Sequence, residues 1–354
     1  MKNKAKKILL WIGITVIGLI ILCLLLGWIV FNRYYNMLDY YDYSDDKYAL
    51  SDAGEEYISD FEGVESFDED IEKYHEEIRD NLKQEKNLDL DSKEMINILL
   101  LGVDATENQY SGRTDMIMLL TINKKENKIC LTSIQRDTYL AIPEEGYDRI
   151  NMAYAQGGVP LLQDTLKENF GIEAEDYVCV NIFAVMDFID LIGGIDVELT
   201  SEEMDVMNEW YIRAHNISLG NPEGTDYLPE DTPGTYHLNG NQAVAYSRVR
   251  FVGSDFARTS RQREVLQLSF EKVKDMSILE LNNMLEELLP KIRTDMTQKR
   301  FLELMAEMVN LSDYSWDTMT IPADGTWENG KIEGKDVLLI DFKKNIELWM
   351  DFVR

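Results

Sequence analysis

The longest uninterrupted apolar run lies near the start of the chain, at residues 8–31, and carries no charge. As a helix it would be about 36 Å long, which is enough to cross a bilayer. Lys2, Lys4, Lys6 and Lys7 precede the run and only Arg33 follows closely. The distribution of positive charge predicts residues 1–7 in the cytoplasm, a transmembrane helix at 8–31 and an extracellular remainder. A cleaved signal peptide is the alternative, but the run is longer than the usual hydrophobic region and no A-x-A-like site follows it.

Three shorter apolar runs open the predicted globular domain, at residues 96–101, 116–122 and 128–134. The first is apolar on both faces, which is typical of a central strand, and polar loops separate the three. An antiparallel meander of these strands would place the end of the first, the start of the second and the end of the third on one edge. Asp104, Asp115 and Arg136 occupy those three places.

Beyond the meander, helical and extended patterns alternate. Residues 160–171 and 184–194 have helical patterns, whereas 177–183 and 195–199 are typical of strands. This alternation favours a layered α/β domain over residues 95–276. Residues 200–236 are irregular and acidic, and we expect a surface excursion there. The remainder, 277–354, is predicted to be a helical extension packed on the same domain, with a last helix at 338–353.

Residues 32–94 form an acidic segment that is rich in Asp, Glu and Tyr. We expect an extracellular spacer that holds the domain away from the bilayer and whose charge repels anionic headgroups. The tyrosines could instead pack on the domain, and the sequence does not decide between the two.

The composition narrows the function classes. A formal net charge of -30 over 354 residues argues against nucleic acid as a partner. Three cysteines exclude a disulfide framework, and buried free thiols are favoured, although a bond between Cys130 and Cys179 stays open. His75, His215 and His237 are scattered and form neither a zinc site nor a catalytic triad.

Against this acidic background, the stretch 247–263 (SRVRFVGSDFARTSRQR) holds five arginines and one acid, Asp255. An extended segment would put Arg248 and Arg250 on one face, and a helix starting near Phe256 would put Arg258 and Gln262 together. Guanidiniums gathered in this way repel one another unless they hold a multiply charged anion, so we interpret the stretch as a phosphate-binding element. A solvated basic helix that neutralises an acidic neighbour is the alternative.

Asp104 and Asp115 add a second chemical signal. Two carboxylates from separate strand ends form a hard oxygen site suited to Mg²⁺ (or Mn²⁺), which takes one or two carboxylates and completes its shell with water and phosphate. Each aspartate alone is more often a turn residue or a helix cap.

Seven blocks, in order and spacing, resemble the LytR-CpsA-Psr family of cell-envelope proteins over residues 97–276: LLLGVD, GRTDMIMLLTI, SIQRDTYLAIP, DRINMAYAQGG, VNIFAVMDFIDLIGGIDVEL, HLNGNQAVAYSRVR and DFARTSRQREVL. The resemblance implies a three-layer α/β/α sandwich around a mixed, largely antiparallel sheet, which encloses an apolar tunnel for a polyprenyl chain. It also implies a Mg²⁺-dependent phosphotransferase. Such an enzyme moves a glycopolymer, as its sugar 1-phosphate, from polyprenyl pyrophosphate to peptidoglycan.

The resemblance assigns roles to individual residues. Asp104 and Asp115 would hold the metal, with Arg113 beside it. Arg149 stands where the family commonly has lysine, which keeps the charge but changes the donor geometry. The pyrophosphate would be contacted by Arg136, Arg248 and Arg250, which we take as catalytic, and by Arg113, Arg149, Arg258 and Gln262.

Several choices stay open. Asp137, Asp255 or a metal ligand could act as the base for the acceptor hydroxyl. The carried glycopolymer could be teichoic acid, capsule or another polymer. A non-catalytic lipid or polymer binder that scaffolds envelope assembly, and a polyprenyl-pyrophosphate hydrolase, are the competing functions.

Overall fold

The computed structural model describes residues 27–42, 69–84, 86, 94–103, 114–229, 231–250, 252–253, 255–308 and 314–354. Most of the predicted transmembrane run, together with Asp104 and Arg113, lies outside these residues. In the parts of the chain that are described, every helix is too short or too polar to cross a bilayer.

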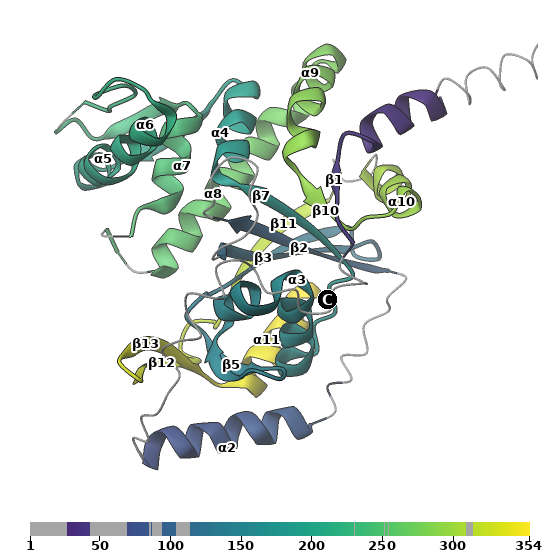
Figure 1. Cartoon of the computed structure of the whole chain (residues 1–354), viewed down its shortest axis with the longest axis vertical. Helices are drawn as coiled ribbons and strands as arrows, with labels where there is room; N and C mark the ends of the chain where they lie inside the picture. The colour runs from purple at the N-terminus through teal and green to yellow at the C-terminus, as the bar shows by residue number, and fades with distance from the viewer. Residues whose placement is uncertain are drawn as a thin grey trace, which may run out of the picture.

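A seven-stranded sheet runs through the middle of the molecule (Figure 1), in the order β1-β10-β7-β2-β3-β4-β11. The predicted meander is present, because β3 pairs antiparallel with both β2 and β4. Three of the six pairings are antiparallel and three are parallel, so the sheet is mixed. The strands are β1 (Asp39–Tyr40), β2 (Met95–Val103), β3 (Thr114–Asn123), β4 (Lys128–Ile134), β7 (Asp176–Asn181), β10 (Arg293–Thr294) and β11 (Ser315–Ile321).

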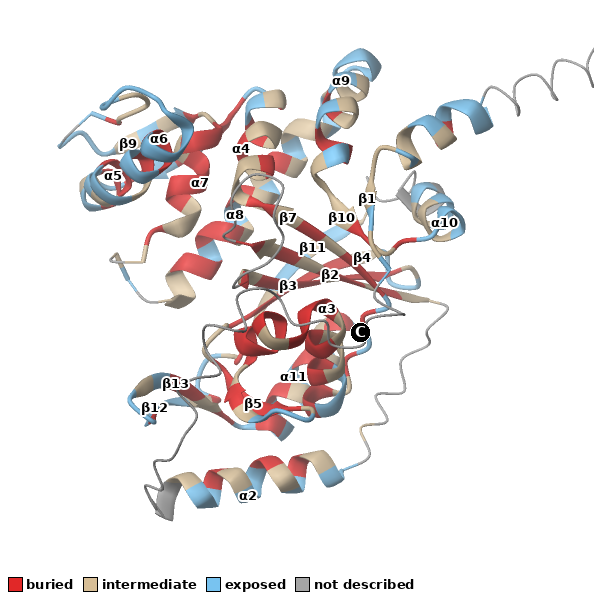
Figure 2. Ribbon diagram, viewed as in Figure 1, coloured by how far each residue is buried: buried red, intermediate tan, exposed pale blue. Residues whose placement is uncertain are grey.

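Helices cover both faces of this sheet, which gives the predicted three layers (Figure 1). One face carries α3 (Ile150–Phe170) and α11 (Phe342–Val353), and their apolar side chains share one core with Leu99 and Leu119 of the sheet. The other side carries α4 (Ile182–Leu191), α7 (Gly240–Arg248), α8 (Asp255–Lys274) and α9 (Ile278–Leu288), which contribute to a second core. Figure 2 shows the buried positions concentrated along the sheet and on the helix faces that meet it.

The C-terminal region differs from the predicted helical extension. It contains α9, η4 (Leu289–Lys291), α10 (Gln298–Met308) and α11, but also the strands β10 and β11 and the hairpin β12 (Trp327–Ile332) and β13 (Lys335–Ile340). β11 extends the main sheet by parallel pairing with β4. The region packs on the same domain as predicted, since Trp349 is 1% exposed and donates to Thr132 of β4.

The excursion at 200–236 is ordered rather than irregular. It folds as α5 (Ser201–Val206), the π-helical segment η3 (Met207–Ile212) and α6 (Arg213–Leu219), and then as β9 (Gly234–Leu238), which pairs with β8 (Ile195–Leu199). Met204, Met207 and Ile212 are fully buried in the second core. The remaining small strands, β5 (Tyr139–Ile142) and β6 (Gly146–Arg149), form a hairpin that ends in α3.

The described parts of the acidic segment pack on the domain. Residues 27–35 are helical, and the phenol of Tyr35 donates to the carbonyl of Met296 at 2.9 Å. Tyr74 and Ile78 of α2 (Glu69–Lys83) are buried in the first core. The tyrosines of this segment therefore include packing residues, which was the alternative to a free spacer.

Both described cysteines, Cys130 and Cys179, are buried and free, so they do not pair. Burial raises the pKa of the Cys130 thiol to about 11 and that of Cys179 to about 12.

Candidate functional site

The site is organised around Asp115, which lies at a β-bulge. Thr114 stands opposite Val103 and Met116 opposite Gly102, so Asp115 has no partner in the register between β2 and β3. A bulge of this kind commonly re-aims a side chain at the edge of a sheet. Here the carboxylate reaches two arginines that come from distant parts of the chain.

The side chains of Asp115 and Arg136 lie close together, as the antiparallel arrangement of the three strands predicted. One carboxylate oxygen of Asp115 accepts from Nη1 of Arg136 at 2.7 Å, and the other accepts from Nη2 of Arg250 at 2.8 Å. Burial opposes ionisation of Asp115, but the charges of Arg250, Arg136 and Arg258 outweigh it and hold the pKa of Asp115 below its ordinary value. The carboxylate is therefore ionised at neutral pH.

Arg258 is the most deeply buried of the predicted ligands that the structure describes, with 1% of its side chain exposed. Its Nη2 donates to Asp255 at 2.8 Å, and its Nη1 lies 3.8 Å from Asp115. Nε and Nη1 of Arg258 and Oε1 of Gln262, one helical turn further on, are buried without a hydrogen-bond partner. Unsatisfied buried polar atoms are costly, so they indicate a polar ligand at this point.

Arg136 and Arg149 share Asp137. Nη1 of Arg149 donates to Asp137 at 3.1 Å, and Nε of Arg136 lies 3.5 Å from the other oxygen. Arg136 also lies 3.9 Å from Asp255. Both residues proposed as bases, Asp137 and Asp255, are thus held by guanidiniums at the rim of the cluster.

Arg248 differs from its expected conformation. It is the last residue of α7 rather than part of an extended segment. Its Nη1 lies 3.2 Å from Nε2 of His215, and its guanidinium lies over the ring of Tyr211 at 5.7 Å. Sequence reasoning missed both partners, because a single histidine in an acidic excursion gave no signal of its own.

The two remaining arginines of the stretch have structural partners. Arg261 donates to Glu203 at 2.9 Å and to the carbonyls of Val249 and Val252, so it clamps the loop that carries Arg250. Arg263 donates to Ser133 and Thr320. Arg263 is therefore partly buried and bonds to strands β4 and β11 of the sheet.

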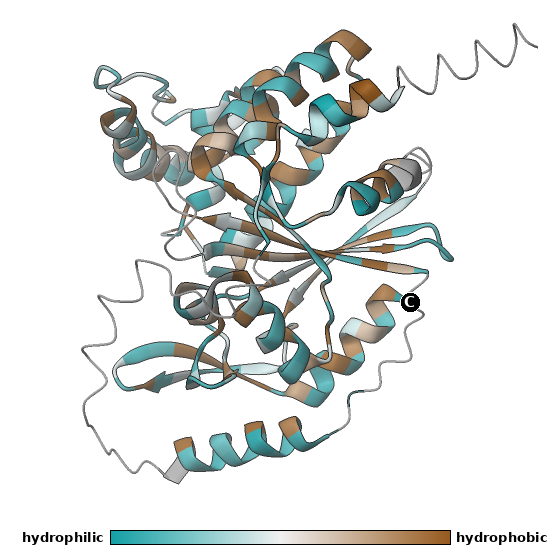
Figure 3. Cartoon of the chain, turned by 45° about the vertical axis from the view of Figure 1, so that its right-hand side comes forward, coloured by the Kyte–Doolittle hydropathy of each residue, from teal (hydrophilic) through white to brown (hydrophobic). Residues whose placement is uncertain are grey.

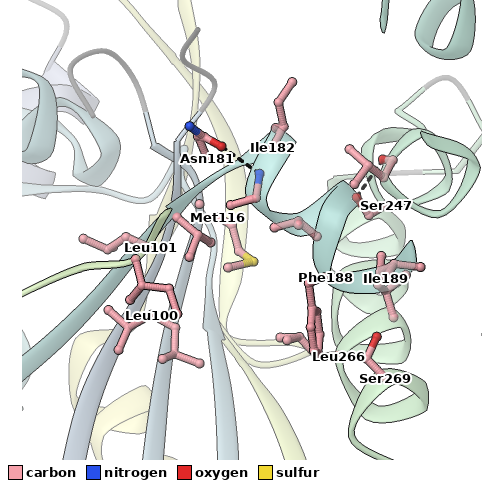
Figure 4. Close-up of a pocket in the computed structure, with 18 of the residues that line it drawn as sticks. Leu100, Leu101, Met116, Asn181, Ile182, Phe188, Ile189, Ser247, Leu266 and Ser269 are labelled. Atoms are coloured by element: carbon pink, nitrogen blue, oxygen red, sulfur yellow. Dashed lines mark hydrogen bonds between the residues drawn. The ribbon is translucent and has the colours of Figure 1, made fainter. Parts of the chain in front are cut away.

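An apolar cavity of about 390 Å³ opens beside the arginines, between the sheet and the helices of the second core. Leu100 and Met116 line it from the sheet side, and Phe188 and Leu266 line it from the helix side (Figure 4). The polar part of the lining includes Asp115, Arg248 and Gln262. Residues of α9 and η4, among them Met284, Leu285, Leu288 and Leu289, also line the cavity.

This combination selects one kind of ligand. Among the described residues, the site gathers five guanidiniums (Arg136, Arg149, Arg248, Arg250, Arg258) and three carboxylates (Asp115, Asp137, Asp255), which is an excess of positive charge. An apolar cavity adjoins that charge. The site therefore suits an amphiphile with a multiply charged anionic head and a long apolar tail.

The metal prediction concerns Asp104 and Asp115, of which only Asp115 is described. Among the described residues no three His, Cys, Asp or Glu side chains gather into a metal site. An ionised carboxylate is a suitable ligand for Mg²⁺. Both oxygens of Asp115 are held by arginines, so one of those contacts would be exchanged when a cation binds.

A model of the LytR_cpsA_psr family matches residues 63–346 of the chain. The chain belongs to this family. Its relatives include TagU of Bacillus cereus, named polyisoprenyl-teichoic acid–peptidoglycan teichoic acid transferase. That protein is 30% identical over 265 residues, which cover 72% of this chain and 80% of the relative.

Solved structures share the fold. A structure of TagT bound to LIIa-WTA has a TM-score of 0.57 and 25% identity, over 77% of this chain and 92% of that one. Protein gbs0355 of Streptococcus agalactiae has a TM-score of 0.59 and 25% identity, over 76% of this chain and 90% of that one.

Proposed function

We propose that the protein is a membrane-anchored, extracellular phosphotransferase that moves a glycopolymer, as its sugar 1-phosphate, from a polyprenyl pyrophosphate carrier to peptidoglycan. The observation that carries the proposal is the apolar cavity whose lining includes the polar residues Asp115, Arg248 and Gln262. The names of the relatives support the substrate class, since TagU is a polyisoprenyl-teichoic acid–peptidoglycan teichoic acid transferase.

In this reaction an acceptor hydroxyl of peptidoglycan attacks the phosphorus that bears the sugar. The bond from that phosphorus to the bridging oxygen breaks, and polyprenyl phosphate leaves. Negative charge grows on the bridging and non-bridging oxygens, and fixed positive charge stabilises it. Arg136, Arg248 and Arg250 supply that charge, with Arg113, Arg149, Arg258 and Gln262 holding the pyrophosphate. In related chemistry a single arginine contributes about 10³-fold or more in rate.

The proton of the attacking hydroxyl passes to a carboxylate. Asp137 and Asp255 lie at the rim of the arginine cluster and are oriented by Arg149 and Arg258. Mg²⁺ or Mn²⁺, held by Asp104 and Asp115, would add positive charge at the pyrophosphate oxygens. When the donor binds, Arg136 and Arg250 would exchange part of their contact with Asp115 for the phosphates.

The anchor and the location are part of the proposal. The uncharged run at 8–31 and the lysines before it support a single-pass protein in the cell membrane, with a cytoplasmic N-terminus and an extracellular domain. Protease added to intact cells should therefore degrade the domain, whereas a protected domain would refute this topology.

The central experiment uses the full chain in vesicles with a polyprenyl-pyrophosphate-linked glycopolymer and peptidoglycan. Arg136→Ala should lower the transfer rate about 10³-fold, and the matched control Arg79→Ala, an exposed arginine of α2 paired with Glu72, should not. Full transfer by Arg136→Ala would refute the assigned role. Donor binding without any product would indicate a scaffold, and release of phosphorylated glycopolymer to water without attachment would indicate a hydrolase.

The metal has its own test. Asp115→Ala should abolish both activity and the dependence on Mg²⁺. A wild-type enzyme that is equally active in chelator would refute the metal site.

A further inference from the structure

Two large aliphatic side chains are strongly exposed at the start of α9. Ile278 is 86% exposed and Leu279 is 77% exposed, the highest values among the large hydrophobic residues that the structure describes. The turn that holds them is firmly built. Ser277 caps the helix and forms a reciprocal capping box with Glu280. Adjacent large apolar side chains exposed on an ordered turn point to an interaction surface.

The helical segment 27–35 lies against the same helix. Nη2 of Arg33 donates to Glu286 at 2.8 Å, and the phenol of Tyr34 bonds to Asn282. At the other end of this segment Trp28, Ile29 and Val30 are 63%, 56% and 52% exposed. The exposed start of α9 and the exposed start of segment 27–35 lie on the same side of the molecule in two views (Figures 1 and 3).

The sequence before this segment identifies the partner. Residues 8–26, which immediately precede it in the chain, are apolar and uncharged. A bilayer is the partner that continues such a run, and the exposed side chains at 28–30 and 278–279 lie on the side of the molecule that would face it. The two lysines that precede Ile278 most closely in the sequence are paired, Lys272 with Asp196 and Lys274 with Glu271. The attraction is therefore hydrophobic rather than electrostatic.

The same helix also forms a wall of the cavity. Met284, Leu285 and Leu288 are among the residues that line the cavity. Ten residues of helix separate Ile278 from Leu288, which corresponds to about 15 Å. A lipid tail that leaves the bilayer beside Ile278 thus has a short path along α9 into the cavity.

We propose that Ile278 and Leu279 insert into the outer leaflet of the bilayer and place the cavity at the membrane surface, where a lipid-linked substrate enters it along α9; the nature of that substrate rests on the proposed function. The contact makes α9 a membrane-docking helix as well as a cavity wall. Loss of the two side chains weakens the docking by about tenfold for each.

The test places a fluorophore at the tip of α9. The full chain with Cys23→Ser and Leu279→Cys is labelled, since burial and a raised pKa keep Cys130 and Cys179 unreactive. It is then reconstituted in phosphatidylcholine vesicles that carry a quencher at the depth of the upper acyl chain. The matched control is Leu348→Cys, an exposed leucine (39%) on α11, which covers the opposite face of the sheet.

Quenching at position 279 but not at position 348, and unchanged by 0.5 M salt, is the expected result. No quenching at 279, or equal quenching at both positions, overturns the docking. Ile278→Asp with Leu279→Asp should also raise the KM for a membrane-embedded donor at least tenfold. The kcat and the KM for a water-soluble, short-chain donor should stay unchanged. An inactive wild type that still shows quenching at 279 would refute the proposed function and leave the docking intact.

Discussion

Nη1 of Arg248 lies 3.2 Å from Nε2 of His215, and Nδ1 of the same imidazole lies 2.8 Å from Oδ1 of Asn241. A guanidinium can only donate, so Nε2 accepts and the proton of the neutral ring sits on Nδ1, facing the amide oxygen. His215 is 3% exposed and belongs to α6, so the excursion at 200–236 fixes the direction of an arginine at the cavity end.

We predict that His215→Ala lowers the kcat of transfer about tenfold, the equivalent of one hydrogen bond to a charged group. His215→Gln, which retains an acceptor, should restore a large part of the rate. His237→Ala, at an exposed histidine that bonds to Asp196, is the control and should leave kcat unchanged. If the alanine and glutamine variants lose the same activity, His215 acts through packing and not through Arg248.

Asp115 should contribute to stability in a pH-dependent way. Its folded pKa is lower than its unfolded pKa, so its contribution is present above about pH 4 and is lost as the pH falls through the folded pKa. Asp115→Asn should therefore lower the free energy of unfolding by about 2 kcal/mol at pH 7 and by less at pH 3. Urea unfolding at the two pH values measures this. A difference that does not change with pH would contradict an ionised, arginine-bound carboxylate.

The buried ion pair of Arg261 and Glu203 should stabilise the loop that carries Arg250 rather than take part in the transfer reaction. Their side chains are 9% and 11% exposed, so removal of one partner leaves a buried charge. Arg261→Met should lower the free energy of unfolding by about 3–5 kcal/mol, whereas Arg261→Met with Glu203→Gln should be less costly. A double-mutant cycle in urea measures the coupling. Additive losses would show that the two side chains do not act as a pair.

Gly240 marks the closest approach of α4 and α7. A Cβ atom there would lie 2.0 Å from the carbonyl oxygen of Met186, and the Gly240 N–H donates to Asp190 at 2.6 Å. Gly240→Ala should force the two helices apart and destabilise the protein by about 1–3 kcal/mol or more. Both helices line the cavity, so lipid binding should weaken as well. Gly234→Ala, where the added atom meets open space, should keep the wild-type melting temperature.

The sequence predicted most clearly those strands that are covered by apolar side chains on both faces of the sheet. The runs that became β2, β3 and β4 were recognisable because these strands are buried in the middle of the sheet. That burial also explains why the convergence of Asp115 and Arg136 could be inferred from strand ends alone. In β11 the apolar signal is missing, since SWDTMTI lies at the edge and only Ile321 is fully buried.

The sequence did not predict which polar side chains pair when they lie far apart in the chain. The two-residue spacing of Arg248 and Arg250 predicted an extended segment with both side chains on one face, but α7 continues to Arg248. Nothing local identified Glu203 as the partner of Arg261, 58 residues away. Such pairs depend on how α5 and α6 fold over α7, and that is decided by the apolar residues of the second core.

The contacts of the N-terminal segments limit how far the domain can move from the membrane. β1 begins only a few residues after the helical segment 27–35, and Asp39 of β1 bonds to Arg293 of β10 at 2.7 Å. Residues 43–68 are therefore bounded on both sides by elements that are fastened to the domain, β1 and α2. In the proposed anchored state, lengthening or shortening that acidic stretch would not lift the domain from the membrane. The distance from the bilayer at which the site can act is then set by the size of the domain itself. In that state only peptidoglycan strands close to the bilayer can serve as acceptors.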